Sequence, residues 1–527
     1  MTADRTYIQV LLPVKLRWVP TYGSPVPLEP GRRVCVTLGR KRYDGVVWRT
    51  LERPDLPPER IQDIVSVQEG LPDVTPEELR FWEFLSGYYL CTPGEVYKAA
   101  YPLLRQRSEQ TAAGIVVRLE QQLARKEEQL AGRHGERVRQ RLEAERDALR
   151  ARIAAARGPE AGHPPAGVSD PGKPQVWSAP ERRQAYLPAI RQALSEGGQV
   201  LVLTPEIAFC DRLEAILTPE FGSRLHLFHS GRTPVRRRAV AEALRSGVPA
   251  VVLGTRSALF LPFRSLRLVI VDEEQDPAYK QTEPAPRYHG RDAAVALAGI
   301  HGARVLLGAA VPSLETLLNV RLGKYTLQQT PLPAAAEIID LPAERRKNGL
   351  VGTFSRKLIA AIRETEGPVV LLRGWEKPDL LREETDALFP GREFRVMTLT
   401  ALSREGAADA ALLAVLQADA LVSRDDFRAD ERAAQIVGVL CQFAPRVIVQ
   451  TAVPARFDAS RSTDDLLAER RQFGFPPYTR LVELRRQGSG EVLERHFLPR
   501  DRSLAARKAQ LLDGLQDGCY LDVDPLD

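Results

Sequence analysis

The stretch LVIVDEEQDPAYKQTEPAPRYHGRD (Leu268–Asp292) decides the fold. It opens with four apolar residues, and Leu266 lies just before them, a pattern that predicts one buried strand of a parallel sheet. Three acids follow directly: Asp272, Glu273 and Glu274. Ligands of an open α/β sheet lie at the carboxyl ends of its strands, so these acids stand where a phosphate-bound Mg²⁺ would be held. Taken alone, they are equally typical of a charged turn.

Residues 176–326 repeat the pattern of an apolar strand that ends in small or polar residues. These strands alternate with helical segments at the pace of a doubly wound α/β sheet. Each strand end is therefore expected to supply a ligand loop at one edge of the sheet. The loops are Thr204-Pro205-Glu206-Ile207, His229-Ser230-Gly231, Gly254-Thr255-Arg256-Ser257 and Gly308-Ala309-Ala310.

The length of 527 residues predicts three or four domains. The composition is ordinary for a globular protein, and the chain lacks both a run of 18 apolar residues and a recognisable signal peptide. Five cysteines lie singly without any CxxC pair, which excludes a cysteine-ligated zinc ribbon and favours reduced thiols in the cytoplasm. The formal charge of +6 favours a polyanionic partner only mildly.

Residues 1–105 are expected to form a small β-rich domain followed by a helix. Two strands, Val34–Leu38 and Tyr43–Trp48, flank a basic turn made of Gly39, Arg40, Lys41 and Arg42. The glycine allows close approach and the cations suit phosphate, although a solvated turn is the competing interpretation. A helix that begins after Thr75 carries aromatic residues at helical spacing, which indicates a core face rather than a base-stacking surface.

Residues 106–157 change to Glu, Arg, Gln, Ala and Leu, with leucines spaced by four and seven. This pattern predicts an inserted helical hairpin with a mixed-charge, solvated face. Residues 158–175 are rich in Pro and Gly and are predicted to be a linker.

The sequence resembles the family of bacterial primosomal replication-restart helicases (PriA), which belongs to helicase superfamily 2. The resemblance is strongest over Val200–Thr316, where TPEI, FHSG, GTRSALFLPF, LVIVDEEQD, YKQ, RYHGRD and GAAVPSLET occur in the family's order. It extends to GRRVCVTLGRK and GYYLCTPGEVYKAAYP near the start, and to DDFRADERAAQ, ERRQFGFPPYTRL and LDVDP further on. It implies two RecA-like helicase lobes, the second one reduced, and a small N-terminal DNA-binding domain. The lobes are expected at 176–326 and 327–452, and a C-terminal domain at 453–527.

The family's phosphate loop is not retained. In its place stands VWSAPERRQAYL (Val176–Leu187), with Ala179 and Glu181 at glycine places. Arg182 takes the place of the lysine and Arg183 that of the threonine. A phosphate loop needs glycine N–H groups, a lysine and a hydroxyl for Mg²⁺. Arg182 and Arg183 are therefore predicted to form at best a weak, vestigial phosphate site, and Asp272 and Glu273 a vestigial catalytic motif.

The second lobe departs from the family as well. The cysteine-rich zinc insert is missing, so no zinc or other metal site is expected. Ile436–Arg446 contains only Arg446 where the family supplies arginine fingers. Gln275 replaces a histidine, and Pro20-Thr21 stands in place of the Phe-Asp pair that grips a DNA 3′ end.

Three functions from different classes follow. The first is a primosome-type protein that binds forked or single-stranded DNA, mainly through phosphates, without ATPase activity. Its expected DNA contacts are Gly39, Arg40, Lys41, Arg42, His229, Ser230, Gly254, Thr255, Arg256, Lys280 and Arg287. The second is a protein-interaction scaffold that works through the helical hairpin. The third is an active ATP-dependent helicase with an unconventional nucleotide site. Primosome or replication-fork proteins are the expected partners, ATP and Mg²⁺ are not expected to bind as they do in the family, and no membrane association is predicted.

Overall fold

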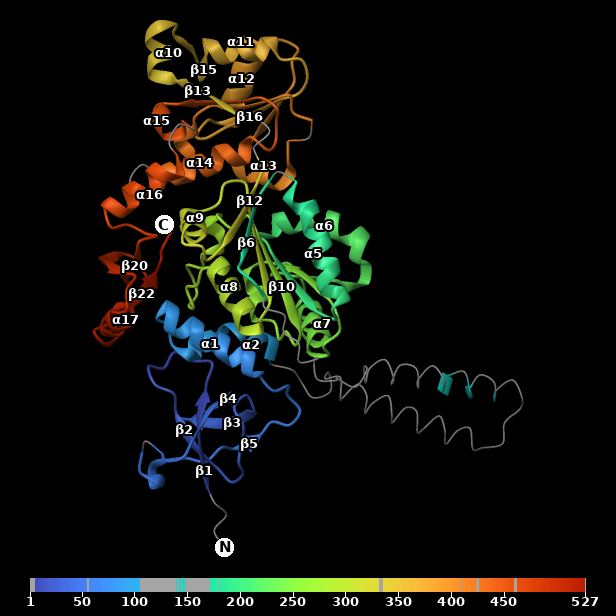
Figure 1. The fold of residues 1–527 in the computed structure, drawn as a ribbon, viewed down its shortest axis with the longest axis vertical. Coiled ribbons are helices and arrows are strands. Elements are labelled where there is room, and N and C mark those ends of the chain that lie inside the picture. The colour runs from blue at the N-terminus through green and yellow to red at the C-terminus, as the bar shows by residue number, and fades with distance from the viewer. Residues whose placement is uncertain are drawn as a thin grey trace.

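The computed structural model describes residues 5–54, 56–104, 139, 142–143, 145–146, 171–179, 181–330, 335–407, 409–422, 426–458 and 462–526. Apart from residues 139, 142–143 and 145–146, the helical hairpin predicted at 106–157 lies outside these residues, and so does most of the linker predicted at 158–175. Figure 1 shows the described parts: an N-terminal domain (blue), a first lobe (green), a second lobe (yellow to orange) and a C-terminal domain (red) beside the first lobe.

The N-terminal domain is an antiparallel sheet with the order β2-β1-β4-β3-β5, followed by two helices. Thr75 caps the first helix in a capping box with Glu78, as the sequence predicts. Phe81, Trp82 and Tyr89 on this helix are buried, which confirms that its aromatic residues form a core. The elements are β1 (Thr6–Leu11), β2 (Thr21–Ser24), β3 (Arg33–Leu38), β4 (Lys41–Leu51), β5 (Ser66–Val67), α1 (Pro76–Tyr89) and α2 (Pro93–Leu104).

The first lobe is a parallel sheet with the order β12-β6-β11-β10-β7-β9-β8. Apolar residues alternate between its two faces: one face packs on α5 and α6, and the other on α7 and α8. Its strands are β6 (Gln175–Ser178), β7 (Gln199–Leu203), β8 (Leu225–Phe228), β9 (Val251–Gly254), β10 (Leu266–Asp272), β11 (Arg304–Ala309) and β12 (Thr326–Gln329). Its helices are α5 (Arg182–Ser195), α6 (Ile207–Phe221), α7 (Pro234–Arg245), α8 (Gly290–His301) and α9 (Leu314–Arg321).

The second lobe is another parallel sheet, with the order β13-β19-β18-β16-β17. Its strands are β13 (Ala336–Asp340), β16 (Val369–Leu372), β17 (Phe394–Met397), β18 (Leu412–Val415) and β19 (Val447–Thr451), with a small hairpin, β14 (Leu350–Val351) and β15 (Phe354–Ser355). Its helices are α10 (Leu341–Lys347), α11 (Arg356–Glu364), α12 (Pro378–Leu388), α13 (Leu399–Glu405), α14 (Ala429–Leu440), α15 (Pro454–Phe457) and α16 (Thr463–Gln472). The two lobes confirm the predicted α/β class.

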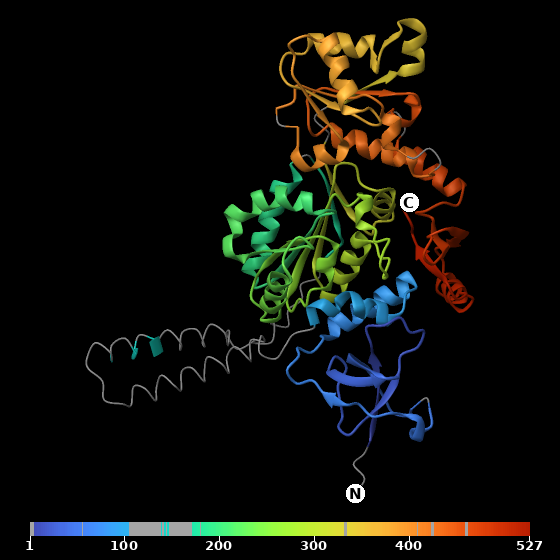
Figure 2. The same ribbon diagram turned by 180° about the vertical axis from the view of Figure 1, so that it is seen from behind.

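The C-terminal domain is an antiparallel sheet, β21-β20-β22, with one flanking helix among the described residues. Its elements are β20 (Thr479–Arg486), β21 (Val492–Pro499), α17 (Leu504–Asp513) and β22 (Cys519–Val523). Val482 and Val523 belong to the same apolar core as the buried face of α1 and the first lobe. The view from behind shows the same arrangement, with the red sheet beside the first lobe and α1 (Figure 2). Among the described residues, no helix combines the length and apolarity that a bilayer crossing demands.

Candidate nucleotide site and nucleic-acid interface

Asp272 and Glu273 lie at the carboxyl end of β10, between the ends of β7 and β11. Both side chains are buried. Glu273 adopts a left-handed backbone conformation (φ 52°), which is uncommon for a residue with a Cβ and clusters at functional sites. The acids therefore stand where the sequence places them, at the ligand edge of the sheet.

Two arginine side chains form ion pairs with these two acids. Arg182 and Arg183 are the first residues of α5. Arg182 Nε donates to Asp272 Oδ1 at 2.9 Å, and its Nη2 donates to Glu273. Arg183 Nε donates to Asp272 Oδ2 at 2.7 Å and its Nη2 to Glu273 Oε1 at 2.6 Å. We call these four residues the arginine–acid cluster.

At Asp272 and Arg182, the effect of the ion pairs on the pKa outweighs that of burial. Burial alone would raise the pKa of Asp272, but the guanidinium groups of Arg182 and Arg183 hold that pKa below its usual value. Burial likewise works to lower the pKa of Arg182, and the two carboxylates raise it instead. Tyr186 Oη also donates to Asp272 Oδ1 at 2.9 Å. Both oxygens of Asp272 are therefore already used by hydrogen-bond donors.

These residues do not fit a magnesium nucleotide. Mg²⁺ needs carboxylate oxygens and a hydroxyl that are free to face it or its water shell. Here guanidinium groups cover the carboxylates, and Ser178 Oγ donates to the carbonyl of Ala310 at 2.9 Å. Residue 182 cannot act as the phosphate-binding lysine while its side chain, which is 0% exposed, pairs with Asp272 and Glu273. The predicted vestigial phosphate site is instead an internal ion-pair network.

The second lobe reaches this cluster through the stretch that lacks the arginine fingers. Arg182 Nη1 donates to Gln442 Oε1 at 3.2 Å. The next residue, Phe443, lies under the guanidinium of Arg212, 5.3 Å from the ring centre. Arg446 turns away and lies 3.7 Å from Glu337 beside β13 and β19. None of these contacts places an arginine of residues 436–446 against Asp272 or Glu273.

The basic turn of the N-terminal domain is exposed. Gly39 and Arg40 connect β3 to β4, and Gly39 has a left-handed conformation (φ 62°) that favours glycine. The side chains of Arg40, Lys41 and Arg42 lie on the exposed tip. A Cβ at Gly39 would meet no atom within 4 Å, so the turn geometry explains this glycine and close packing does not.

The candidate DNA residues of the first lobe divide into exposed and structural positions. Ser230 is exposed, and Thr255 is partly exposed. His229 is buried, and its Nε2 accepts a hydrogen bond from Arg232 at 3.3 Å. A Cβ on Gly254 would lie 2.2 Å from the carbonyl oxygen of Phe228, so strand packing requires this glycine. Arg256 donates to the carbonyls of Ala278 and Lys280 and braces the loop after β10.

Lys280 and Arg287 attach the C-terminal domain instead of facing solvent. Lys280 is 4% exposed, and its Nζ donates to Asp522 Oδ1 at 2.6 Å and to the carbonyl of Val523 at 2.8 Å. The guanidinium of Arg287 lies 3.6 Å from the centre of the Tyr520 ring. We therefore revise the predicted role of both residues: their cationic groups join β22 to the first lobe and are not available to DNA in this conformation.

A polar junction between the two lobes and the C-terminal domain was not predicted. Arg291 donates to Glu274 Oε2 at 3.0 Å and to Ser313 Oγ at 2.6 Å. Glu431 on α14 accepts from the backbone N–H of Leu314 at 2.9 Å and from Arg470 at 3.1 Å. The polar residues after β11 could have indicated this network, but from the sequence alone they only supported the family resemblance.

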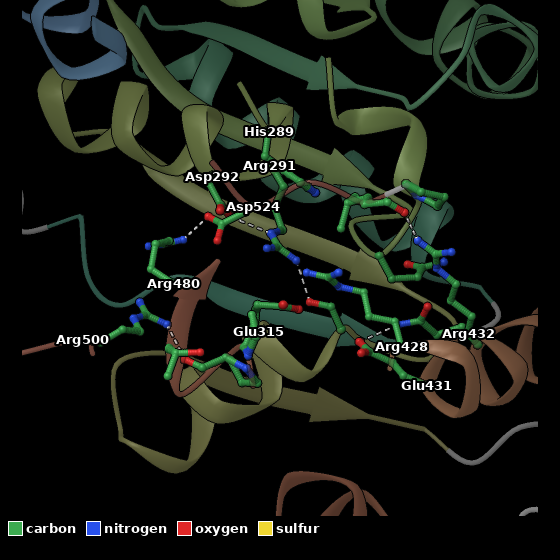
Figure 3. Close-up of a pocket in the computed structure, with 18 residues that line it drawn as sticks. His289, Arg291, Asp292, Glu315, Arg428, Glu431, Arg432, Arg480, Arg500 and Asp524 are labelled. Carbon is green, nitrogen blue, oxygen red and sulfur yellow. Dashed lines mark hydrogen bonds and ion pairs between the residues drawn. The ribbon is translucent and has the colours of Figure 1, made fainter. Parts of the chain in front are cut away.

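The junction encloses a cavity of about 60 Å³. Figure 3 shows Arg291, Asp292 and Glu315 of the first lobe facing Arg428 and Glu431 of the second lobe and Arg480 of the C-terminal domain. Gln275 Oε1, His289 Nδ1 and Arg480 Nε are buried beside it without a hydrogen-bond partner among the described residues. The volume suffices for a few water molecules, which would satisfy these atoms.

Two parallel α/β lobes that meet at the carboxyl end of β10 define the class of protein: a two-lobed α/β chain. Residues 9–102 match the family model described as the PriA 3′ DNA-binding domain. The chain is 35% identical over 204 residues to the replication restart protein PriA of Chlamydia pneumoniae and 39% identical over 192 residues to that of Haemophilus influenzae. It is also 28% identical over 372 residues to the PriA of Rickettsia conorii.

These matches show that parts of the chain are similar to PriA proteins. The aligned regions cover 38%, 35% and 67% of this chain, and 26%, 25% and 51% of the respective relatives, so the chain spans at most about half of their length. Among solved structures, it is similar to RecG bound to a three-way DNA junction, with 13% identity and a TM-score of 0.37. That match covers 65% of this chain and 47% of the RecG chain.

Proposed function

We propose that this protein is a PriA-type DNA-binding protein that attaches to forked or single-stranded DNA and does not turn over ATP. The match of residues 9–102 to a 3′ DNA-binding domain supports the DNA partner. The exposed turn at Arg40, Lys41 and Arg42 supports contacts to phosphate rather than to base edges. Primosome or replication-fork proteins are the class of protein partner that the similarity to PriA proteins favours.

One observation carries the absence of ATP turnover: the guanidinium groups of Arg182 and Arg183 pair with the acids that would otherwise face Mg²⁺. A nucleotide would have to break these buried ion pairs before its metal could reach Asp272. Breaking buried ion pairs separates charges in a low-dielectric site, which is unfavourable. The alternative of an active helicase with an unconventional site is for this reason disfavoured.

The DNA-binding part is tested by fluorescence anisotropy with a labelled fork that carries a free 3′ end. We expect affinity to fall steeply between about 0.05 and 0.2 M salt because protein cations that bind phosphates release counterions. Replacement of Arg40, Lys41 and Arg42 by alanine should weaken binding and reduce the salt slope by roughly one for each phosphate that the variant no longer binds. The chain offers a matched control in Arg345, Arg346 and Lys347, three exposed cations on α10.

The control variant removes the same charge from the second lobe and should leave the salt slope unchanged. Equally weak binding by the two triple variants would mean that net charge, and not the turn, governs the affinity. If the wild-type protein at micromolar concentration binds no DNA in a salt-sensitive manner, DNA binding is not its function. The interaction-scaffold alternative would then be favoured.

A further inference from the structure

We propose that the arginine–acid cluster takes the place of a nucleotide in bridging the two lobes, so that the lobes stay closed without a ligand. This inference goes beyond the proposed function: the absence of ATP turnover alone leaves open whether the lobes are free to separate. A guanidinium group presents five N–H donors in a fixed plane. Arg182 donates hydrogen bonds from this group to residues of both lobes.

Three sides of the Arg182 guanidinium point to different partners. Nε and Nη2 bind Asp272 and Glu273 in the first lobe. Nη1 binds Gln442 Oε1 in the second lobe at 3.2 Å. The position that should hold a phosphate-binding lysine therefore holds a side chain that touches both walls of the cleft.

The cluster needs no added ion for charge balance. Its two guanidinium groups face two carboxylates, and all four groups are held by the ion pairs described above. In a nucleotide site the acids require a metal cation to offset them, and the metal in turn brings phosphate. Here Arg182 and Arg183 supply that positive charge from within the chain. The closed arrangement is therefore electrically complete in the free protein.

A second contact joins the lobes beside the cluster. Arg212 on α6 donates from Nη1 to the carbonyl of Ser403 on α13 at 3.0 Å. Its guanidinium also lies over the ring of Phe443. Burial, and after it the positive charge of Arg183, lower the pKa of Arg212. The guanidinium of Arg212 is thus partly removed from water, and its contacts with Ser403 and Phe443 exist only while the lobes are together.

A third contact closes the opposite end of the cleft. The N-terminus of α9 donates the N–H of Leu314 to Glu431 on α14. Next to this bond, Leu314 and Leu318 pack against Leu466 and Leu467 of α16 in one buried apolar group. The polar junction of Figure 3 lies at this end and adds Arg291, Glu315 and Arg428 to the seam.

Between these contacts the lobes are not packed tightly. A cavity of about 570 Å³ lies among Phe209, Gln275, Ile436 and Val439, with walls from both lobes. Closure therefore depends on the discrete contacts at the two ends rather than on a continuous apolar interface. Removing one of these contacts is expected to let the lobes separate without unfolding either of them.

The test measures the distance between the lobes in the full chain by single-molecule FRET. Dyes are attached through non-natural amino acids at Glu196 and Asp386, which are exposed on the first and second lobe. The expected wild-type result is one high-efficiency population that does not change when magnesium ADP or a non-hydrolysable magnesium ATP analogue is added. Gln442→Leu and Arg212→Ala should each add a low-efficiency population.

These two variants lie outside the arginine–acid cluster, so the fold of the first lobe should survive them; circular dichroism verifies this. Arg191→Ala, which removes an exposed arginine of α5, should behave as the wild type. A broad wild-type distribution, a shift on nucleotide addition, or variants that match the wild type would each overturn the proposal. Because DNA binding and ATP turnover are measured separately, the closed-lobe inference can fail while the proposed function stands.

Discussion

At the scale of single residues, the deciding feature is a pair of substitutions whose effect depends on two acids far away in the sequence. Arg182 and Arg183 replace residues that bind phosphate and metal in the family, and both turn to Asp272 and Glu273. Replacing the lysine by a neutral residue would have left buried carboxylates without a counter-charge, which is strongly unfavourable. The pairing of the arginines with these acids therefore has a structural role.

Arg182→Ala tests this structural role. It leaves two buried carboxylates facing a single guanidinium, and the free energy of unfolding is expected to fall by about 3–5 kcal/mol. Urea denaturation followed by intrinsic fluorescence measures this decrease. Arg191→Ala, which breaks an exposed ion pair with Glu220 on the neighbouring helix, should change it far less, because exposed ion pairs contribute little to stability. If both variants are destabilised by the same small amount, the cluster contributes nothing to stability.

A second prediction at this scale concerns His301, at the end of α8. Burial lowers its pKa to about 4, whereas an unfolded chain has a histidine pKa near about 6.5. Between these values only the unfolded state binds the proton, so stability falls as the pH drops through this window. The expected slope is about 1.4 kcal/mol per pH unit.

His301→Gln removes this contribution. The difference in free energy of unfolding between wild type and variant should therefore shrink by up to about 2 kcal/mol from pH 7 to pH 5. Glu431, whose pKa burial and Glu315 raise to about 7, acts in the opposite sense. It is present in both proteins and cancels in the comparison. A difference that is independent of pH would contradict the assignment.

At the scale of elements, the strand β22 shows how distant parts of the chain are joined. It completes the C-terminal sheet, packs against α1, and receives the buried ammonium of Lys280. Burial lowers the pKa of Lys280 and raises that of Asp522, and their ion pair opposes both shifts. A loop that the family resemblance had assigned to DNA thus holds the C-terminal domain in place.

Lys280→Met should loosen this attachment. The variant keeps the aliphatic stem and leaves Asp522 buried without its cation, so local opening of β22 becomes easier. Hydrogen exchange at the amides of Leu521–Val523 should rise at least about tenfold, because a tenfold change corresponds to only about 1.4 kcal/mol. Lys324→Met, on an exposed loop, is the control. Unchanged exchange in both variants would mean that Lys280 does not attach the strand.

At the scale of the whole molecule, the structure combines two lobes with an N-terminal domain that matches a 3′ DNA-binding domain model. The apolar faces of both sheets are complete, so the fold does not depend on a nucleotide. The proposed function, DNA binding without ATP turnover, requires this fold but no motor cycle.

A steady-state ATPase assay with single-stranded DNA examines the whole chain. We expect no turnover above background, and Asp272→Ala should leave this baseline unchanged. Turnover near about 1 s⁻¹, which is ordinary for enzymes, that disappears in Asp272→Ala would show a working nucleotide site. It would also contradict the assignment of Arg182 and Arg183 as permanent partners of the acids.

Local sequence patterns were sufficient for the sheet of the first lobe. The apolar run before Asp272 predicts a buried strand, and that strand lies between two others as β10. The core face of α1 and the hairpin around Gly39 could also be predicted from local sequence patterns. Hydrophobic periodicity and turn chemistry depend on residues that are close together in the chain, so they can be recognised in a single sequence.

By itself, the sequence determined the lobes, the family resemblance and the absence of the phosphate loop. Only the tertiary structure decided that Arg182 and Arg183 pair with Asp272 and Glu273, and that Lys280 and Arg287 join β22. The physical reason is that a long cationic side chain reaches any acid within several ångströms of it. Which acid lies there is set by how the elements pack, and residue spacing does not reveal it.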